Sequence, residues 1–336
     1  MLLKCFGWFF IGLIILASMA LALIWQDYQG YLDEPLPLST EGATVQITPG
    51  TSYKRLAHQL AAQGLMENPE YWYWYGRQRG QAQRIQAGEY AIPAGTTPAQ
   101  LFDLLIAGKT IDYQLTFVEG STFRQLMAAI RAHPALTQTL QDLTPAAIMA
   151  RLGQPGLHPE GQFFPDTYQF PRGTTDLAYL RRAYQRMQTE KQQAWAQRAP
   201  NIMLKTAEEA LIMASIVEKE TGQGSERPLI SGVFDRRLRI NMKLQTDPTV
   251  IYGMGERYQG NIRRRDLRED TPYNTYVHRG LPPTPICMPG RAALEAAVRP
   301  APGKALYFVA KGDGSHQFSA TLRAHNAAVR RYQLKK

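Results

Sequence analysis

A carboxyl group at the end of an apolar stretch is the feature of this sequence best suited to chemistry. Residues 210–217, ALIMASIV, carry no charge, and Glu218, Lys219 and Glu220 follow them directly. At 100° per residue in a helix, Glu218 extends the apolar stripe that contains Leu211 and Ala214. We therefore expect the Glu218 side chain to point inward, whereas Lys219 and Glu220 face solvent or the rim of a site.

The surroundings expected for Glu218 would disfavour its ionised form. Burial penalises a charged carboxylate, and the negative end of the helix dipole acts in the same direction. A carboxyl group in such a place would hold its proton near neutral pH, as a general acid for an ether-like leaving group must. An arginine beside Glu218 would cancel both effects and leave an inert buried ion pair, and a helix that merely reaches the surface is the second alternative.

Three further stretches offer groups for the walls of a binding groove. In LQTDPTVIYG, Asp247 precedes Pro248, so we expect Asp247 to cap a helix, with a second catalytic carboxylate as the alternative. The loop TPYNTYVHRGLPPTPICMPG, residues 271–290, combines amide, hydroxyl and aromatic groups with five prolines, which suits a sugar-binding cleft. The loop HPEGQFFPDTYQFP, residues 158–171, is similar, and a plain surface connection is its alternative.

The amino-terminal segment predicts a membrane anchor. Residues 6–25 contain no charged residue, and twenty helical residues span about 30 Å, the thickness of the hydrocarbon core of a bilayer. Trp8 and Trp25 lie near the ends, and Lys4 precedes the segment, which favours a cytoplasmic amino terminus. A cleaved signal peptide is the alternative, because small residues at 18–22 resemble a cleavage site. Residues 27–43 contain glycines and prolines with little periodic pattern, which predicts a stalk.

The rest of the chain predicts an α+β fold. Three stretches, ITPGTSYKRLAHQL, IPAGTTPAQLFDLL and FVEGSTFRQLMAAI, share a pattern of strand end, glycine turn, hydroxyl cap and amphipathic helix. Between the first two, aromatic residues fill positions 71–75, either as a glycan platform or as packing. Further helices are expected at about 121–132, 145–152, 175–197, 206–221 and 321–333, with a strand, a Gly-Asp-Gly turn and a strand within 305–320.

Composition narrows the possible partners. The chain of 336 residues has 38 basic and 28 acidic residues, a net charge of +10, which favours polyanions such as lipid headgroups or wall polymers. The basic residues are dispersed and lack interleaved aromatics, so we expect no nucleic acid partner. The two cysteines and six histidines show no metal-ligand spacing, so we expect no metal and no cofactor.

Five motifs in order resemble those of one family. The stretches EGQFFPDTY, ASIVEKET, LQTDPTVIYG, YNTYVHRGLPPTPI and HQFSATLRAHN are similar to motifs of the endolytic murein transglycosylases, the YceG-like lytic transglycosylases. The resemblance implies residues 1–26 as cytoplasmic stub and transmembrane anchor, 27–43 as stalk, 44–113 as a small LysM-like module and 114–336 as an α+β catalytic domain.

The resemblance also implies a function. Members cut the glycan of peptidoglycan internally, at the β-1,4 bond after N-acetylmuramic acid, without water, and leave 1,6-anhydro ends. Glu218 matches the catalytic glutamate, and we expect the surrounding groove to contain Glu160, Glu220, Gln245, Thr246, Asp247, Tyr252, Tyr273, Asn274 and Tyr276. The expected partners are glycan strands, the membrane, and synthases whose nascent strands the enzyme would release. A muramidase using Glu218 with Asp247, and a non-enzymatic wall-binding scaffold, are the rival functions.

Overall fold

The computed structural model describes residues 2–334, with side chains from residue 11 onward, so the side chains of Lys4, Cys5 and Trp8 lie outside the described part. The chain forms two compact units, residues 1–113 with 170–173 and residues 114–169 with 174–336. The strands β3 (Asp112–Thr116) and β5 (Thr167–Pro171) pair with each other, and the chain passes from one unit to the other within each of them.

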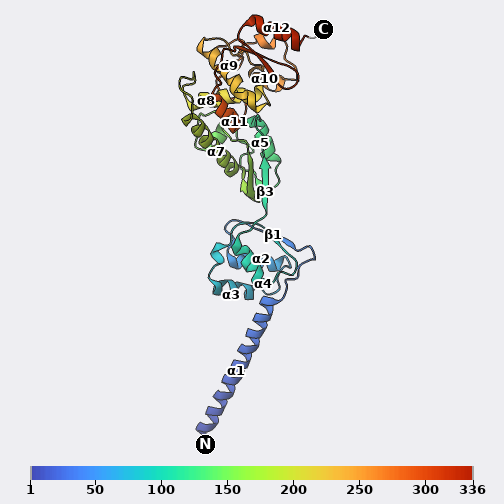
Figure 1. Cartoon of the computed structure of the whole chain (residues 1–336). Coiled ribbons are helices and arrows are strands. Elements are labelled where there is room, and N and C mark those ends of the chain that lie inside the picture. Colours follow the sequence, from blue (N-terminus) through green and yellow to red (C-terminus); the bar gives the residue numbers. More distant parts are fainter. Residues whose placement is uncertain (1, 335–336) are drawn as a thin grey trace. The chain divides into compact units, whose positions relative to one another are not determined.

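The first unit combines one long helix with a small mixed fold (Figure 1). Its elements are α1 (Leu2–Asp33), β1 (Ala43–Ile47), α2 (Tyr53–Ala62), α3 (Pro69–Arg79), β2 (Gly88–Ile92) and α4 (Pro98–Ala107). Strands β1 and β2 pair antiparallel, with Ala43 opposite Ile92 and Ile47 opposite Gly88. Side chains from all of these elements, including the buried Trp72 and Phe102, form the core of the unit.

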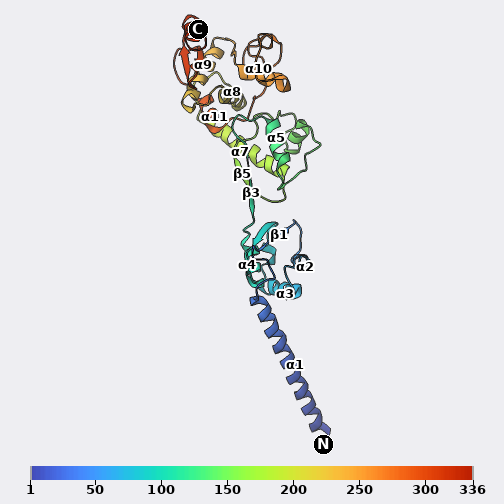
Figure 2. The same cartoon turned by 90° about the vertical axis from the view of Figure 1, so that its right-hand side faces the viewer.

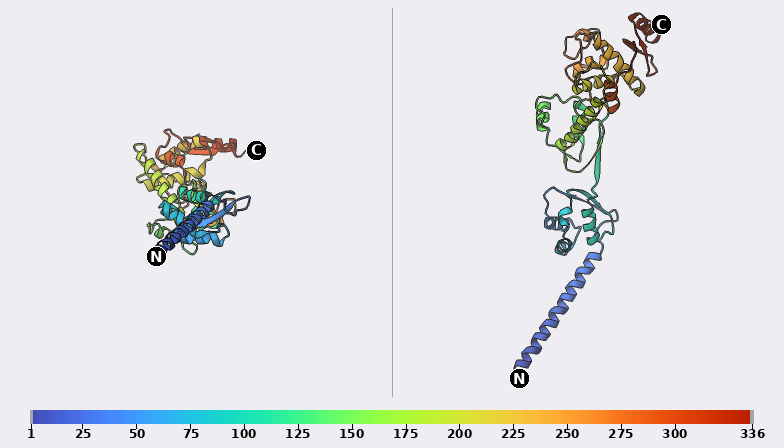
Figure 3. Two further views of the ribbon diagram at one scale, coloured as in Figure 1. Left: turned by 90° about the horizontal axis from the view of Figure 1, so that it is seen from below. Right: turned by 60° about the vertical axis from the view of Figure 1, so that its left-hand side comes forward.

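Helix α1 is long and apolar enough to cross a membrane between Ile11 and Asp33. It continues without a break into the segment expected to form a stalk, where Tyr28, Leu32 and Leu36 are buried (Figure 3, right). The stalk is therefore helical as far as Asp33. Tyr28 and Leu32, four residues apart on α1, share one buried face of the helix, and Leu36 packs on the core just beyond its end.

The second unit is built around helices. Its elements are α5 (Phe123–Ala132), β4 (Leu136–Thr137), α6 (Pro145–Arg151), β6 (Thr174–Thr175), α7 (Asp176–Ala196), α8 (Ala207–Glu220), α9 (Arg227–Arg239), α10 (Asp247–Met254), α11 (Arg291–Val298), β7 (Tyr307–Ala310), β8 (His316–Ser319) and α12 (Leu322–Tyr332). Helix α8 packs against α7, α9, α10 and α11 (Figure 2). Residues 210–217 of α8 are all buried, which confirms that this apolar stretch forms a core helix.

The three strand–turn–helix stretches have the predicted local structure. Gly50, Gly95 and Gly120 have φ near +80°, a conformation that favours glycine. Ser52, Thr97 and Thr122 cap α2, α4 and α5. The helices expected at 145–152, 175–197, 206–221 and 321–333, and the strands within 305–320, are confirmed to within about two residues. Thr206 caps α8 by accepting from the Glu209 N–H, and the Glu209 carboxylate accepts from the Lys205 N–H.

One local expectation is wrong, and the structure decides between two alternatives for part of the aromatic run. Asp247 is not a helix cap: Thr246 occupies that position, Asp247 is the first residue of α10, and its carboxylate accepts from the Tyr276 hydroxyl at 2.6 Å. In the aromatic run, Trp72 is fully buried and donates to the Pro98 carbonyl at 2.9 Å, so packing is its role. Trp74 is exposed.

A buried serine ties α8 to the loop that precedes α11. Ser215 Oγ donates to the Ile212 carbonyl at 2.7 Å and accepts from the Ile286 N–H at 3.0 Å. The Cys287 thiol donates to the Ser215 carbonyl at 3.3 Å. These bonds fix residues 286–290 against the helix whose last turn carries Glu218.

Replacement of this serine tests the attachment. Ser215→Ala leaves the buried Ile286 N–H without an acceptor, which we expect to lower the free energy of unfolding by about 1–3 kcal/mol. Ser225→Ala, at an exposed position, is the control and should change it by less than about 0.5 kcal/mol. Denaturant unfolding measures both values. Equal effects in the two variants would contradict the assigned role of Ser215.

Candidate active site

The ends of three helices meet at Glu218. Glu218 lies in the last turn of α8, Arg227 is the first residue of α9, and Gly290 precedes the first turn of α11. One carboxylate oxygen of Glu218 accepts from Arg227 Nη2 at 3.0 Å and the other accepts from the Gly290 N–H at 3.0 Å. The side chain of Glu218 is 6% exposed, so the predicted inward direction is confirmed.

The charges around Glu218 differ from those expected from the sequence. The expectation was that burial and the α8 dipole act on the carboxyl group without a cation nearby. Instead, the guanidinium of Arg227 and the amino-terminal end of α11 both present positive charge to it, and both stabilise an anion. The arginine partner, left open as an alternative by the sequence, is therefore present in the structure.

Arg227 has a second carboxylate within reach. Its Nη2 lies 3.9 Å from Glu119, whose side chain is 49% exposed, and its buried Nε has no hydrogen-bond partner among the described residues. Burial raises the pKa of Glu119, the negative charge of Glu218 raises it further, and Arg227 lowers it. The guanidinium is therefore shared by two carboxylates that repel each other, and it retains an unused donor.

The absence of a side chain at Gly290 and Gly120 lets the backbone approach the carboxylates of Glu119 and Glu218 closely. A Cβ at Gly290 would collide with the carboxylate of Glu119, so a side chain at position 290 would displace it. The loops that carry Glu119 and Gly290 are joined by two bonds, from the Gly120 N–H to the Met288 carbonyl at 2.9 Å and from the Met288 N–H to the Ser121 carbonyl at 2.8 Å. The position of Glu119 is thus set by the same loop as the amide that binds Glu218.

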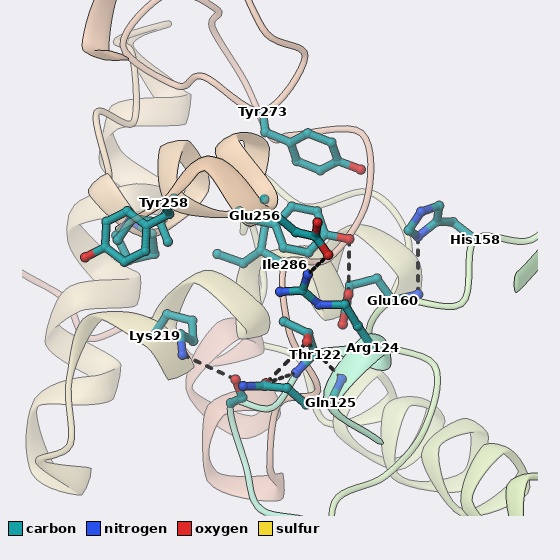
Figure 4. A pocket seen from close by; sticks show the side chains of 15 residues that line it. Thr122, Arg124, Gln125, His158, Glu160, Lys219, Glu256, Tyr258, Tyr273 and Ile286 are labelled. Carbon is teal, nitrogen blue, oxygen red and sulfur yellow. Dashed lines mark hydrogen bonds and ion pairs between the residues drawn. The ribbon is translucent and has the colours of Figure 1, made fainter. Parts of the chain in front are cut away.

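A cavity of about 820 Å³ adjoins this group of charges, and Figure 4 shows its lining. Gly120, close to the Glu218 side chain, and Lys219, the next residue after Glu218, form part of its wall, whereas Glu218 itself is not a lining residue. The Lys219 ammonium points to the Gly120 carbonyl at 3.3 Å, and Arg124 pairs with Glu256 at 2.6 Å (Figure 4). Three residues expected in the groove, Glu160, Tyr252 and Tyr273, line this first cavity.

Glu160 is the most buried titratable group of the first cavity. It is 3% exposed and accepts from the Phe123 N–H at 3.0 Å and from the Tyr252 hydroxyl at 3.1 Å. Burial raises its pKa to about 7, and the two hydrogen bonds oppose that shift. The ring of Tyr252 packs edge-on against Tyr273 at 4.8 Å, which orients both phenols in the wall.

Four of the other predicted residues lie at a second cavity of about 500 Å³, whereas Thr246 and Asn274 do not line it. Glu220, Gln245, Asp247 and Tyr276 line it. Glu220, expected at the solvent or the rim, has a carboxyl group that burial affects strongly: its pKa is raised to about 7, although the Thr246 hydroxyl, which donates to it, opposes the shift. Gln245 has φ of +50°, a strained conformation for a residue with a side chain, and such strain is common at functional sites.

Asn274 has a different position from the one expected. It is fully buried, and its side-chain amide donates to the carbonyls of Asp266 and Glu269 and accepts from the Tyr276 N–H. These bonds use the amide within its own loop, so Asn274 orients Tyr276 rather than forming a cavity wall. Among the described residues, no group of three or more histidine, cysteine, aspartate or glutamate side chains could hold a metal ion.

Sequence reasoning missed Arg227, Glu119 and Gly290. A signal for Glu119 was present in the repeated stretches, where the residue before the turn glycine is Pro49, Ala94 and then Glu119. A carboxylate at a position that two similar stretches fill with uncharged residues indicates a separate role. Arg227 and Gly290 carry no such signal, because their relation to Glu218 depends on tertiary packing.

A double-mutant cycle tests the ion pair. Arg227→Met leaves the buried Glu218 carboxylate without its cation, and we expect a loss of about 3–5 kcal/mol in the free energy of unfolding at pH 7. Glu218→Gln in the same chain should recover most of that loss. Arg257→Met is the control, because its pair with Glu269 is exposed and worth less than about 1 kcal/mol. A coupling below about 0.5 kcal/mol between positions 218 and 227 would contradict the pair.

The pH dependence of stability tests the burial of Glu160. Its pKa is about 7 in the folded chain against an ordinary value of 4.5, so the folded state binds more protons between these pH values. The free energy of unfolding therefore falls as pH rises from 4.5 to 7. Glu160→Gln should remove up to about 3 kcal/mol of this fall, whereas Glu295→Gln, an exposed control, should leave it unchanged. Identical pH profiles for wild type and Glu160→Gln would refute the assignment.

The sequence of the whole chain is similar to those of known bacterial proteins. The chain is similar to an endolytic murein transglycosylase from Bacillus subtilis (strain 168), 31% identical over 310 residues that cover 86% of this chain and 84% of the relative. A protein of the same name from Streptococcus pneumoniae serotype 2 is 26% identical over 346 aligned positions, covering 90% of this chain and 61% of that longer relative.

A solved structure and a family sequence pattern both relate the chain to YceG-like proteins. The crystal structure of a yceG-like protein from Listeria monocytogenes is similar, with 29% identity, a TM-score of 0.54, and coverage of 86% of this chain and 99% of that one. The sequence pattern that defines the YceG-like family matches residues 45–331. Most of both units lies within that match, and the chain belongs to the YceG-like family.

Proposed function

We propose that this protein is an endolytic lytic transglycosylase that cuts the glycan of peptidoglycan between N-acetylmuramic acid and N-acetylglucosamine and leaves 1,6-anhydro ends. The names of the relatives support this activity. The observation that carries the proposal is the position of Glu218. Its side chain, 6% exposed, follows the buried stretch 210–217 and lies next to Gly120 and Lys219, which line the cavity of about 820 Å³.

One carboxyl group is enough for this reaction. Protonated Glu218 gives its proton to the bridging oxygen as the bond from that oxygen to the anomeric carbon breaks. The resulting carboxylate takes the proton of the 6-hydroxyl of the same muramic acid while that oxygen bonds to the anomeric carbon and closes the anhydro ring. No water is consumed. Glu218 ends the cycle protonated, so it is ready for the next linkage.

The ion pair explains how Glu218 would be kept ready. At rest Arg227 neutralises its charge, which makes a buried carboxylate tolerable. We propose that a sugar entering beside Gly120 shifts the guanidinium toward Glu119, which lies 3.9 Å from Nη2. The carboxylate oxygen of Glu218 that now accepts from Arg227 would then be free to bond to the sugar.

The two cavities supply the groups for holding sugar rings on either side of the cut. Tyr252 and Tyr273 offer aromatic faces in the first cavity, and Gln245, Asp247 and Tyr276 offer polar groups in the second. The buried carboxyl groups of Glu160 and Glu220, whose pKa values are about 7, would act there as both hydrogen-bond donors and acceptors. Thr246 and Asn274 would position these residues.

The amino-terminal helix would place the enzyme at the bacterial inner membrane, with its catalytic unit outside the cytoplasm. We propose that it acts there on strands emerging from peptidoglycan synthases and ends their elongation. The LysM-like role of residues 44–113 is part of the proposal. A polar cavity of about 270 Å³, lined by Thr48, Thr51, Ser52 and Gln83, supports glycan binding by this unit.

A two-carboxylate hydrolase is the alternative enzyme. Its second carboxylate would be Glu119, which shares Arg227 with Glu218, rather than Asp247, which bonds to Tyr276 in the second cavity. A hydrolase would add one water to each cut and leave reducing ends. A scaffold protein would cut nothing.

Digestion of purified uncross-linked glycan strands by the full-length protein in detergent micelles separates these functions. We expect wild type to produce internal cuts with anhydro ends, seen by mass as products without added water. Glu218→Gln should lower the rate by at least about 10³-fold while circular dichroism shows an unchanged fold. Glu295→Gln, exposed on α11, should cut like wild type. Reducing ends would establish the hydrolase, and unchanged cutting by Glu218→Gln would refute the role of Glu218.

A further inference from the structure

A groove in the first unit opens at the level of the proposed membrane surface. It measures about 330 Å³ and lies between α1 and α3, with Leu21, Ile24, Trp25 and Tyr28 on one side and Tyr71 and Trp74 on the other. The four α1 residues follow the spacing i, i+3, i+4 and i+7, so they form one face of that helix.

Aromatic contacts hold the two walls of the groove in place. The Tyr71 hydroxyl donates to Asp27 at 2.8 Å, and the Tyr28 hydroxyl donates to Gln78 at 3.3 Å. The ring of Tyr71 packs edge-on against those of Tyr28 and Tyr31 at 5.5 and 5.6 Å. Helix α3 is therefore fixed to α1 at the level of residues 27–31, as Figures 1 and 2 show.

The depth of the groove follows from the length of α1. From Leu21 to Tyr28 the helix rises about 10 Å. If residues 6–25 span the hydrocarbon core, the Leu21 end of the groove lies inside that core and the Tyr28 end lies among the headgroups. The lining matches this division, because Leu21 and Ile24 are apolar, whereas Glu70 and Gln78 on α3 are polar.

The exposed aromatic residues fit the same boundary. Trp74 is 59% exposed and Trp25 is 57% exposed, although both belong to a unit that buries Trp72 completely. Water-exposed tryptophans on a packed fold are unfavourable, whereas indole rings prefer the region between headgroups and hydrocarbon. Trp74 comes from a helix outside the span, so its exposure on the groove indicates that α3 itself meets the bilayer.

We propose that this groove binds a phospholipid of the outer leaflet, with an acyl chain against Leu21 and Ile24 and the headgroup beside Glu70 and Gln78, and that Trp74 anchors α3 in the membrane interface. This inference rests on the proposed membrane anchor and adds a second contact with the bilayer. A second copy of the chain, or another membrane helix, is the competing occupant.

Photocrosslinking of the full-length protein in phosphatidylethanolamine–phosphatidylglycerol nanodiscs tests the proposal. p-Benzoylphenylalanine replaces Trp74 in one variant and the exposed Gln83 of the same unit in the control. We expect lipid adducts at position 74 to be at least tenfold more abundant than at 83, with the mass of one phospholipid. Adducts to a second copy, or equal lipid labelling at both positions, would overturn the proposal.

A second measurement leaves Trp74 in the wild-type chain. Brominated lipid in the nanodiscs should quench the tryptophan emission of wild type more than that of Trp74→Phe, because Trp74 contributes quenched emission only in wild type. Equal quenching in both would again overturn the proposed lipid contact of the groove. Carbonate extraction of cell membranes tests the anchor separately. Release of the chain would refute the anchor and the groove together, whereas retention without lipid contact at Trp74 would refute the groove alone.

Discussion

The contact between the Glu218 carboxylate and the Arg227 guanidinium is the constraint on which the second unit depends. Residues 210–217 of α8 are buried, and the side chain of Glu218 that follows them is only 6% exposed, so its charge needs a counter-charge. The structure meets this need by bringing the starts of α9 and α11 to the end of α8. Ser215 and the bonds between the loops of Gly120 and Met288 hold that meeting point together.

Stability and chemistry place opposite demands on this carboxylate. The folded chain at rest needs it charged and paired, whereas the proposed reaction needs it protonated. In the proposed mechanism Glu119 would reconcile the two demands, because a guanidinium with two carboxylates in reach can change partner without losing all of its electrostatic stabilisation. In the proposed reaction the proton would return to Glu218, so a single protonation would serve repeated cuts.

Local structure could be predicted from the sequence wherever it is determined by residues close together along the chain. Helical periodicity placed Glu218 inward, and the glycine and hydroxyl positions predicted three strand–turn–helix stretches. Contacts between distant segments could not be predicted from the sequence. An example is the bond from the Gly290 N–H to Glu218, because these residues are 72 positions apart. The same limit explains why Asp247 was placed as a cap, since its bond to Tyr276 was invisible, and why the expected groove residues divide between two cavities.

The unbroken passage of α1 into the first unit also has a mechanical meaning. Tyr28 and Leu32 of α1, and Leu36 just beyond it, are buried in that unit. No flexible segment therefore separates the unit from the helix. If α1 spans a membrane as we propose, the first unit would stay at a constant distance from the lipid rather than at the end of a flexible tether.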